Sequence, residues 1–485
     1  MAPSRPTGHR PIARNAAFQV GGRMFVSAAR LGMAILIVRL SGVERYGQYS
    51  LILSFLVIAE WLVDFGITDI GVRDISRRPE QEQLLLRAVA LLCGAQAVFA
   101  YVITVGALLF LGYSAPLVRA GVVGGASLLF YAVAVAFRVL FRVRMRIEHD
   151  VIGEAIGTLA MVPLIVLAGG AGAQIDAFMG AYLASRIVQA AVVAYLGRRD
   201  ILPGTAGVSR LPLKLILGQA VPLGIVGLLV SINDNMVAVV LSKLADIHAV
   251  AEYQYATRFV FPIIMIVQSM NVAFFPTLSG TWKSDPKRFS ETQQNALEAS
   301  VIVGAGLFCL INAGAEFLLG IAGNGLQHAT LVFRLMSYAV LLQVVTLPVT
   351  PLIVVAGGVY KVLWFTALLV VMQFAALVEA VPRYGAPGAA AAYLAIKLVV
   401  GTVPIILISQ RLTGVRLRWG VPVKTVLCAL SALAISQWLF GLGSLWVAVF
   451  CALLYCALVL ASGTAKWGRV GRILRSMRDT GGRRD

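Results

Sequence analysis

"RLGMAILIVRLSGVERYGQYSLILSFLVIAEWLVD" (Arg30 to Asp64) contains two long apolar runs on either side of a short polar turn. An apolar run of about 20 residues is long enough to cross the hydrocarbon core of a membrane as a helix. The stretch therefore predicts two transmembrane helices, near residues 16–40 and 46–70, that meet at a turn near Val43.

The same pattern recurs along the whole chain of 485 residues, which is 59% hydrophobic and only 13% charged. Soluble domains are about half apolar and about a quarter charged. We therefore predict an all-α integral membrane protein with about 14 transmembrane helices. The other twelve spans are expected near residues 84–111, 116–139, 152–171, 176–197, 214–242, 254–281, 294–320, 328–356, 360–381, 386–409, 421–440 and 443–463.

The net charge of +19 is concentrated in short loops and at the two ends of the chain. Lys and Arg are retained on the cytoplasmic side of membrane proteins, and here alternate loops carry most of them. We predict a multi-pass protein of the cell inner (plasma) membrane with both termini in the cytoplasm. Nucleic acid is not an expected partner, because the basic residues lack interleaved aromatic side chains or a DNA-binding motif.

Several classes of chemistry have no support in the sequence. The five cysteines are scattered and form no C-x-x-C pair, so they predict neither disulfides nor a metal site. No G-x-x-x-x-G-K-[ST] loop occurs, so an ATPase domain is not expected. The predicted outer loops are too short for a catalytic domain. We expect no cofactor, no metal and no enzymatic activity.

Three pairs of segments suggest that the chain is a duplication. "YGQYS" at Tyr46 resembles "EYQYA" at Glu252, "GALLFLG" at Gly106 resembles "GAEFLLG" at Gly314, and "AYLASRIV" at Ala181 resembles "AYLAIKLV" at Ala392. Six spans in each repeat predict a parallel repeat, with its axis along the membrane normal. The predicted parts are a cytoplasmic N-terminus (1–15), an N-lobe (16–197), a linker (198–213), a C-lobe (214–409), two further helices (421–463) and a basic cytoplasmic tail (464–485).

Charged residues inside the predicted spans are the candidate functional residues, because charge at that depth is costly and usually faces a bundle interior or a wet cavity. Equal counts from the turns predict an Arg30–Glu60 pair and an Asp234–Arg258 pair. Structural ion pairs or snorkelling side chains are the simpler interpretation of any single one. The full set is Arg30, Glu60, Asp64, Arg186, Asp234, Arg258, Glu316 and Lys397.

Two details refine this set. Arg186 and Lys397 follow "AYLA" in the two repeats, so they are predicted to hold an anionic ligand between the lobes. Asp234 lies in "SINDNMVAVV", and a helix turns about 100° per residue, so three consecutive side chains cannot share one face. We assign the cavity or gate role to Asp234 and treat Asn233 and Asn235 as its hydrogen-bonding flanks.

The first hairpin resembles that of the bacterial polysaccharide (O-antigen-type) flippases, a family of the multidrug/oligosaccharidyl-lipid/polysaccharide exporter superfamily. Its typical pattern is A-R-x-L-G-P-x-x-Y-G-x-Y, of which Val43 replaces the proline. In the second half "AEYQYATRF" is similar to the family's G-x-Y-x-x-A-x-R, although Glu252 replaces the glycine. The residues of the first hairpin that match are Arg39, Gly42, Tyr46, Gly47 and Tyr49.

The resemblance implies two six-helix lobes around a cavity that opens alternately to each side of the membrane. It implies a substrate of oligosaccharide on a polyprenyl diphosphate, membrane lipids as surroundings and the polysaccharide polymerase machinery as a candidate partner. An ion gradient or the membrane potential would supply the energy. The diphosphate would bind Arg30, Arg186, Arg258 and Lys397, and coupling or gating would use Glu60, Asp64, Asp234 and Glu316.

Three other functions remain open at this point. A drug or organic-cation antiporter of the same superfamily would favour an acidic cavity, whereas the deep charges here are mixed. A membrane polysaccharide polymerase or ligase would favour a large outer loop, which the chain does not have. A purely structural assembly partner would not need charged residues inside the spans of both halves.

Overall fold

The computed structural model describes residues 9–198, 212–350, 353 and 359–464, apart from positions 171, 173, 283, 324, 327, 328 and 442. Within these residues all regular secondary structure is helical. Residues 1–8 of the predicted N-terminus, 199–211 of the predicted linker and 465–485 of the predicted basic tail lie outside the described residues. The all-α fold predicted from the sequence is confirmed.

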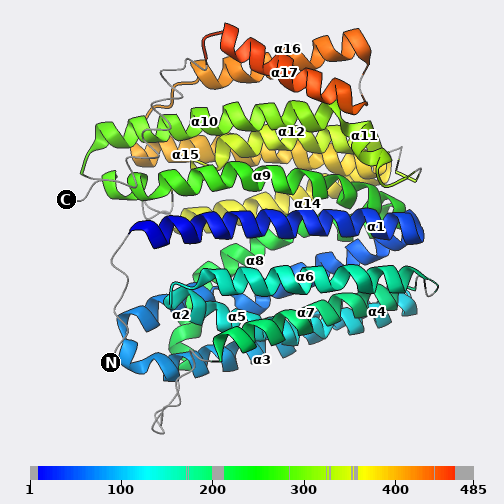
Figure 1. Cartoon of the computed structure of the whole chain (residues 1–485), viewed down its shortest axis with the longest axis vertical. Coiled ribbons are helices and arrows are strands. Elements are labelled where there is room, and N and C mark those ends of the chain that lie inside the picture. The colour runs from blue at the N-terminus through cyan, green and yellow to red at the C-terminus, as the bar shows by residue number, and fades with distance from the viewer. Residues whose placement is uncertain are drawn as a thin grey trace. The chain divides into compact units, whose positions relative to one another are not determined.

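The chain divides into two compact units, and the first comprises residues 1–251. Its helices are labelled in Figure 1. Within it α6 packs against α1 and α7, α5 packs against α3 and α7, and α8 packs against α1 and α2. Its helices are α1 (His9–Asp64), α2 (Ile67–Arg77), a short 3₁₀ turn η1 (Pro79–Gln81), α3 (Glu82–Phe110), α4 (Ala115–Gly125), α5 (Ser127–Val143), α6 (Ile147–Gly170), α7 (Ile175–Gly197) and α8 (Leu213–Leu244).

The second unit comprises residues 252–485. Helix α10 lies at its centre and packs against α12, α16 and α17 around buried residues such as Phe308. The division between the units falls inside α9, whereas the repeat predicts a lobe boundary at residues 198–213, so the lobe limits stay a prediction. The helices are α9 (Ile247–Thr281), α10 (Pro286–Ala313), α11 (Ala315–Gly320), α12 (Thr330–Thr346), α14 (Val359–Ile396), the π-helix η3 (Lys397–Thr402), α15 (Val403–Thr413), α16 (Gly420–Phe440) and α17 (Leu445–Ala461).

The helices have the length and composition of membrane spans. Among the described residues nine helical stretches are apolar and long enough to cross a bilayer, and α12 and α17 are shorter apolar helices. Helix α1 has 56 residues, about 80 Å at 1.5 Å per residue, which is far more than one span needs. It consists of two spans joined by a kink at Gly42, where φ is 83°. A second kink, at Gly385 in α14, separates two more predicted spans.

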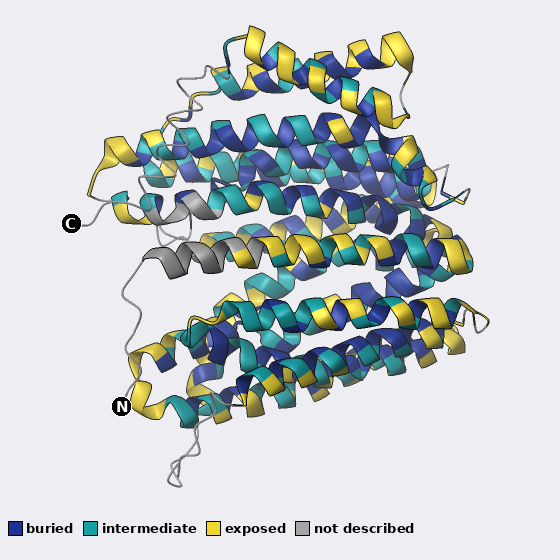
Figure 2. Cartoon of the chain, in the orientation of Figure 1, coloured by how far each residue is buried: buried dark blue, intermediate teal, exposed yellow. Residues whose placement is uncertain are grey.

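Exposed residues occur along many of the helices (Figure 2), and many of them are large and apolar. Phe110, Trp364, Trp438 and Trp446 are each at least 75% exposed. Apolar patches of this extent are unusual on soluble monomers and mark surfaces that contact lipid or protein. The exposed surfaces of these helices are therefore suited to contact with the hydrocarbon core of a membrane.

Two consecutive residues with positive φ end α1 and start α2. Phe65 has φ 37° and Gly66 has φ 76°. A Cβ atom on Gly66 would lie 3.2 Å from the carbonyl oxygen of Ala220 and from Cβ of Leu223, both on α8. The break therefore allows close packing against α8 and leaves Asp64 at the very end of α1.

Substituting Gly66 tests that packing. Gly66→Ala is expected to destabilise the protein by more than the 1–2 kcal/mol that a left-handed conformation costs an L-residue, because the added methyl also meets α8. Gly112→Ala is the matched control, since Gly112 has φ 65° and nothing within 4 Å of its added Cβ. Thermal unfolding in detergent compares the two variants. Equal losses would show that α8 does not restrict this position.

Candidate functional site

A buried ion pair joins α1 and α7 in the N-terminal unit. Arg186 Nη2 contacts Glu60 Oε1, and the two side chains are only 8% and 15% exposed. Arg186 lies eleven residues from each end of α7, about 17 Å along the axis in both directions. The pair therefore lies near the middle of a predicted span, where an unpaired charge would be most costly.

Neighbouring polar groups accept hydrogen bonds from the Arg186 guanidinium. Nη1 donates to Gln189 Oε1 at 2.8 Å, and Nη2 donates to the Tyr182 hydroxyl at 2.8 Å. Tyr182 in turn donates to Glu60 Oε1 at 2.9 Å. Tyr182, Arg186 and Gln189 are spaced i, i+4 and i+7, so they share one face of α7. The spacing of these three residues can be read from the sequence, but neither Tyr182 nor Gln189 was among the predicted site residues.

A second cluster of charges surrounds Arg138 on α5. Arg138 Nε lies 3.0 Å from Asp150 Oδ2 on α6 and Arg138 Nη1 lies 3.9 Å from Asp64 Oδ2. Asp64 Oδ1 also accepts the backbone N–H of Thr68 at 3.1 Å, within the first turn of α2. Arg138 lies at the end of the predicted span 116–139, and neither Arg138 nor Asp150 was among the predicted site residues, so the site is larger than expected.

Tyr131 on α5 connects the two clusters. Its ring centre lies 5.1 Å from the Arg186 guanidinium carbon and 5.7 Å from that of Arg138. A guanidinium over an aromatic face is attracted by the ring's negative face. One aromatic ring thus contributes to holding both arginines.

A third ion pair, Arg30 with Glu154, joins α1 to α6 at 2.9 Å. The Arg30 side chain is 43% exposed and that of Glu154 is 28% exposed. We expected Arg30 to pair with Glu60, and this prediction was wrong. Arg30 and Glu60 have different partners because Glu60 faces α7, whereas Arg30 faces α6.

We refer to the charged residues of these two clusters and of the Arg30–Glu154 pair together as the N-unit network. It brings three arginines and four carboxylates together on α1, α5, α6 and α7. Asp150 Oδ1 is buried and accepts no hydrogen bond from the described residues. Its charged members are Arg30, Glu60, Asp64, Arg138, Asp150, Glu154 and Arg186.

The sequence prediction at Asp234 is met only in part. Asp234 lies exposed on α8, and its Oδ1 accepts a hydrogen bond from Asn233 Nδ2 at 3.4 Å. Asn235 instead donates to the backbone oxygen of Ser231 at 2.9 Å, on its own helix. Asn233 is therefore a hydrogen-bonding flank of Asp234, whereas the assignment of Asn235 as a second flank was wrong.

The other predicted residues belong to the second unit. Glu316 on α11 pairs with Arg334 at 3.0 Å, and its side chain is 50% exposed. Lys397 is the first residue of the π-helix η3, an irregularity that is often found at functional sites. Arg258 is partly buried on α9. Its predicted pairing with Asp234, like the joint anion site of Arg186 and Lys397, involves residues of different units and stays a prediction.

Solved structures of membrane transporters are similar to this structure. The structure is similar to "Lipid II flippase MurJ, inward closed conformation", with a TM-score of 0.77, 12% identity, and coverage of 92% of this chain and 97% of that one. It is also similar to an inward-facing multidrug resistance MATE transporter of the MOP superfamily, with a TM-score of 0.63, 14% identity and coverage of 80% and 95%. These likenesses show the fold.

A MOP superfamily transporter from Pyrococcus furiosus matches with a TM-score of 0.59, 15% identity and coverage of 84% and 96%. No curated protein sequence matches the chain. Residues 12–282, more than half of the chain, match the sequence profile described as "Polysaccharide biosynthesis protein". The chain therefore belongs to the polysaccharide biosynthesis protein family and has the fold of the MurJ and MATE transporters.

Proposed function

We propose that this protein carries oligosaccharides linked to a polyprenyl diphosphate from the cytoplasmic to the outer leaflet of the inner membrane. Its family membership and transporter fold support this class of activity. The observation that carries the proposal is the N-unit network, which places seven charged side chains on the four helices α1, α5, α6 and α7.

Stability alone does not explain such a network. Replacing a buried ion pair by well-packed apolar residues is often neutral or stabilising, so buried charge is weak evidence for a structural role. The more exposed Arg30–Glu154 pair and the buried Arg186–Glu60 pair each have one member on α1. This arrangement suits a protein in which a charged substrate or a proton moves between a wet surface and the bundle interior.

The cations of the predicted set suit the diphosphate. Arg30, Arg258 and Lys397 are the proposed headgroup ligands, because a guanidinium or ammonium group forms charge-assisted hydrogen bonds to phosphate oxygens. Arg186 is already paired with Glu60. In our proposal a proton taken up by Glu60 weakens that pair and makes Arg186 available to the substrate.

The energy for net movement would come from an ion gradient or the membrane potential. Glu60 and Asp64 are the proposed coupling residues of the N-unit network. Asp234 and Glu316 are assigned gating or coupling roles outside the network. Both termini are proposed to lie in the cytoplasm, where the polymerase machinery is a candidate partner through the exported glycan.

Deleting the gene tests the function. We expect repeat units linked to undecaprenyl diphosphate to accumulate with their sugars facing the cytoplasm, because the step that moves them across the membrane is missing. Extraction and mass spectrometry of lipid-linked intermediates measure this, and complementation by the wild-type gene is the control. Unchanged glycans together with raised sensitivity to cationic drugs would contradict the proposal and support the antiporter alternative.

A further inference from the structure

Helix α8 is packed unevenly along its length. Seven of its ten buried residues lie between Ser231 and Leu241, and only three lie in the longer stretch before Ser231. This better buried part is near the end of α8 predicted to face the outside, because the seventh predicted span starts in the cytoplasm. In the first unit α8 contacts α1, α2 and α3. The outer end of α8 is therefore the part of the helix that packs most tightly against its neighbours.

A lysine at this outer end binds the C-terminus of α3. Lys243 Nζ donates a hydrogen bond to the backbone oxygen of Leu111, the residue directly after α3. The same ammonium group lies 3.6 Å from the ring centre of Tyr113. Carbonyl groups at a helix C-terminus lack helical partners and attract cations, as does the face of an aromatic ring. One turn of the chain thus holds Lys243 with two different groups.

Tyr113 connects the same turn to α8 a second time. Its hydroxyl lies 2.6 Å from Ser242 Oγ, and its ring meets the ring of Phe55 on α1 edge to face, with the ring centres 6.0 Å apart. Gly112, with φ 65°, lets the chain turn directly after α3. The resulting cluster joins α1, α3 and α8. We call it the outer latch, and its members are Leu111, Tyr113, Ser242 and Lys243.

The outer latch differs from the contacts that α8 makes nearer its other end. There α8 approaches α1 through glycines: a Cβ atom on Gly224 would lie 2.6 Å from the backbone oxygen of Phe65, and one on Gly227 would lie 2.4 Å from the ring of Trp61. The latch instead depends on hydroxyl groups and one ammonium group, and Lys243 is exposed. Water can replace each of these hydrogen bonds, so breaking them costs little free energy. The outer end of α8 is therefore the end that can open.

The orientation of the protein does not explain a cation at this position. Lys and Arg are retained on the cytoplasmic side, and Lys243 is one of the few predicted to lie outside. Arg45 is another, and it hydrogen-bonds at 3.0 Å to Gln48, a residue of its own helix. Lys243 instead contacts a residue 132 positions away. That contact connects the first predicted repeat to α8, the first helix of the second.

We propose that Lys243 and Tyr113 are gating residues, which hold the outer end of α8 against α1 and α3 until the substrate is released to the outer leaflet. Separation of α8 from the first predicted repeat is the movement that release to the outside requires. The role in transport rests on the proposed function. The opening of the latch does not, because it can be measured without substrate.

The reactivity of a buried cysteine measures this opening. The five native cysteines are replaced by alanine, and Ala238→Cys is the reporter, because Ala238 is fully buried on α8. A membrane-impermeant maleimide is added outside right-side-out vesicles. It is expected to react about tenfold faster with the reporter when Lys243→Gln or Tyr113→Phe is present, because losing one hydrogen bond of about 1.4 kcal/mol raises the open population by that factor.

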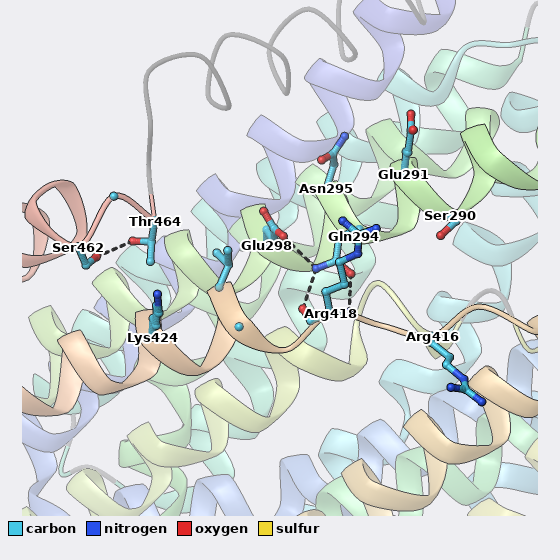
Figure 3. Close-up of a pocket in the computed structure, with 13 residues that line it drawn as sticks. Ser290, Glu291, Gln294, Asn295, Glu298, Arg416, Arg418, Lys424, Ser462 and Thr464 are labelled. Carbon is cyan, nitrogen blue, oxygen red and sulfur yellow. Dashed lines mark hydrogen bonds between the residues drawn. The ribbon is translucent and has the colours of Figure 1, made fainter.

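Two controls separate the latch from other effects. Arg45→Gln removes an outer cation that bonds within its own helix, so the reaction rate is expected to stay unchanged. Gln294→Ala is the destabilising control. Gln294 on α10 donates to the backbone oxygen of Arg418 at 2.8 Å and accepts its backbone N–H at 2.9 Å (Figure 3). Its loss is expected to lower the thermal unfolding midpoint without exposing the reporter.

A bridge across the latch tests its role in transport. Tyr113→Cys and Ser242→Cys are combined in the same cysteine-free background and joined by a short, reducible bifunctional thiol reagent. The bridged protein is expected to lose translocation of the lipid-linked oligosaccharide and to recover it on reduction, because α8 cannot leave α3 while the bridge is in place. The unbridged double variant is the control.

The outcomes distinguish the latch from the transport function. Equal reactivity of the reporter with the intact latch, with Lys243→Gln and with Tyr113→Phe would overturn the latch, whatever the transport result. Undiminished translocation by the bridged protein would overturn its role in the cycle. A reporter that responds as expected, in a protein that translocates no oligosaccharide with or without the bridge, would support the latch and contradict the proposed function.

Discussion

Replacing Arg186 by leucine is expected to abolish translocation of the lipid-linked oligosaccharide and to lower the free energy of unfolding by about 3–5 kcal/mol. The loss of stability arises because Glu60, whose side chain is 15% exposed, remains buried without its cation. The loss of transport arises because Arg186 holds Tyr182 and Gln189 in the same network. Thermal unfolding and accumulation of lipid-linked intermediates measure the two effects separately.

Two further variants separate the effect of this ion pair on stability from its effect on transport. Glu60→Leu combined with Arg186→Leu removes both charges, so stability is expected to return to within about 1 kcal/mol of the wild type, whereas transport stays lost. Arg186→Lys keeps the charge but loses the planar fork that contacts several partners at once, so partial transport is expected. A double variant that transports normally would show that the pair is only structural.

The Arg30–Glu154 pair is expected to behave in the opposite way. Arg30→Gln should reduce transport more than tenfold while it changes the free energy of unfolding by less than about 1 kcal/mol, because a pair this exposed contributes little to stability. The reduction in transport is expected because Arg30, 43% exposed within a predicted span, is a proposed ligand of the diphosphate. Complementation of the deletion strain measures transport, and thermal unfolding measures stability.

The Arg119–Asp176 pair provides the matched control. Arg119 Nη2 lies 3.5 Å from Asp176 Oδ2, and the Arg119 side chain is 68% exposed, so this too is an accessible ion pair of the same unit. It lies outside the N-unit network, and Arg119→Gln should leave both transport and stability unchanged. If Arg30→Gln is as harmless as Arg119→Gln, Arg30 is not a substrate ligand.

The helices were predictable from the sequence because each span must satisfy its own backbone hydrogen bonds in lipid, which makes apolar length a direct signal. The kink at Gly42 fell beside the turn predicted at Val43. Two other interruptions of the helices were not predicted. The predicted span 116–139 is divided into α4 and α5, and α2 is a separate short helix after the break at Phe65 and Gly66.

The charged site was predictable by position but not by partner. Depth along a helix follows from residue counting, which identified Glu60 and Arg186, whereas the pairing depends on how each helix is rotated about its axis. Counting from the turn therefore assigned Arg30 to Glu60, although the structure pairs Arg30 with Glu154. Arg138 was overlooked because a cation near the end of a span is explained by the orientation of the protein in the membrane. Its contact with Asp150 depends on the packing of α5 against α6.

Translocation by the purified protein tests the account most directly. The protein is reconstituted into vesicles with a fluorescent oligosaccharide on polyprenyl diphosphate, and a membrane-impermeant quencher measures which leaflet holds the sugar. We predict that an imposed potential or pH gradient moves the labelled sugar across the bilayer with the wild type and not with Arg186→Leu. Movement no faster than in protein-free vesicles, under every imposed gradient, would contradict the account.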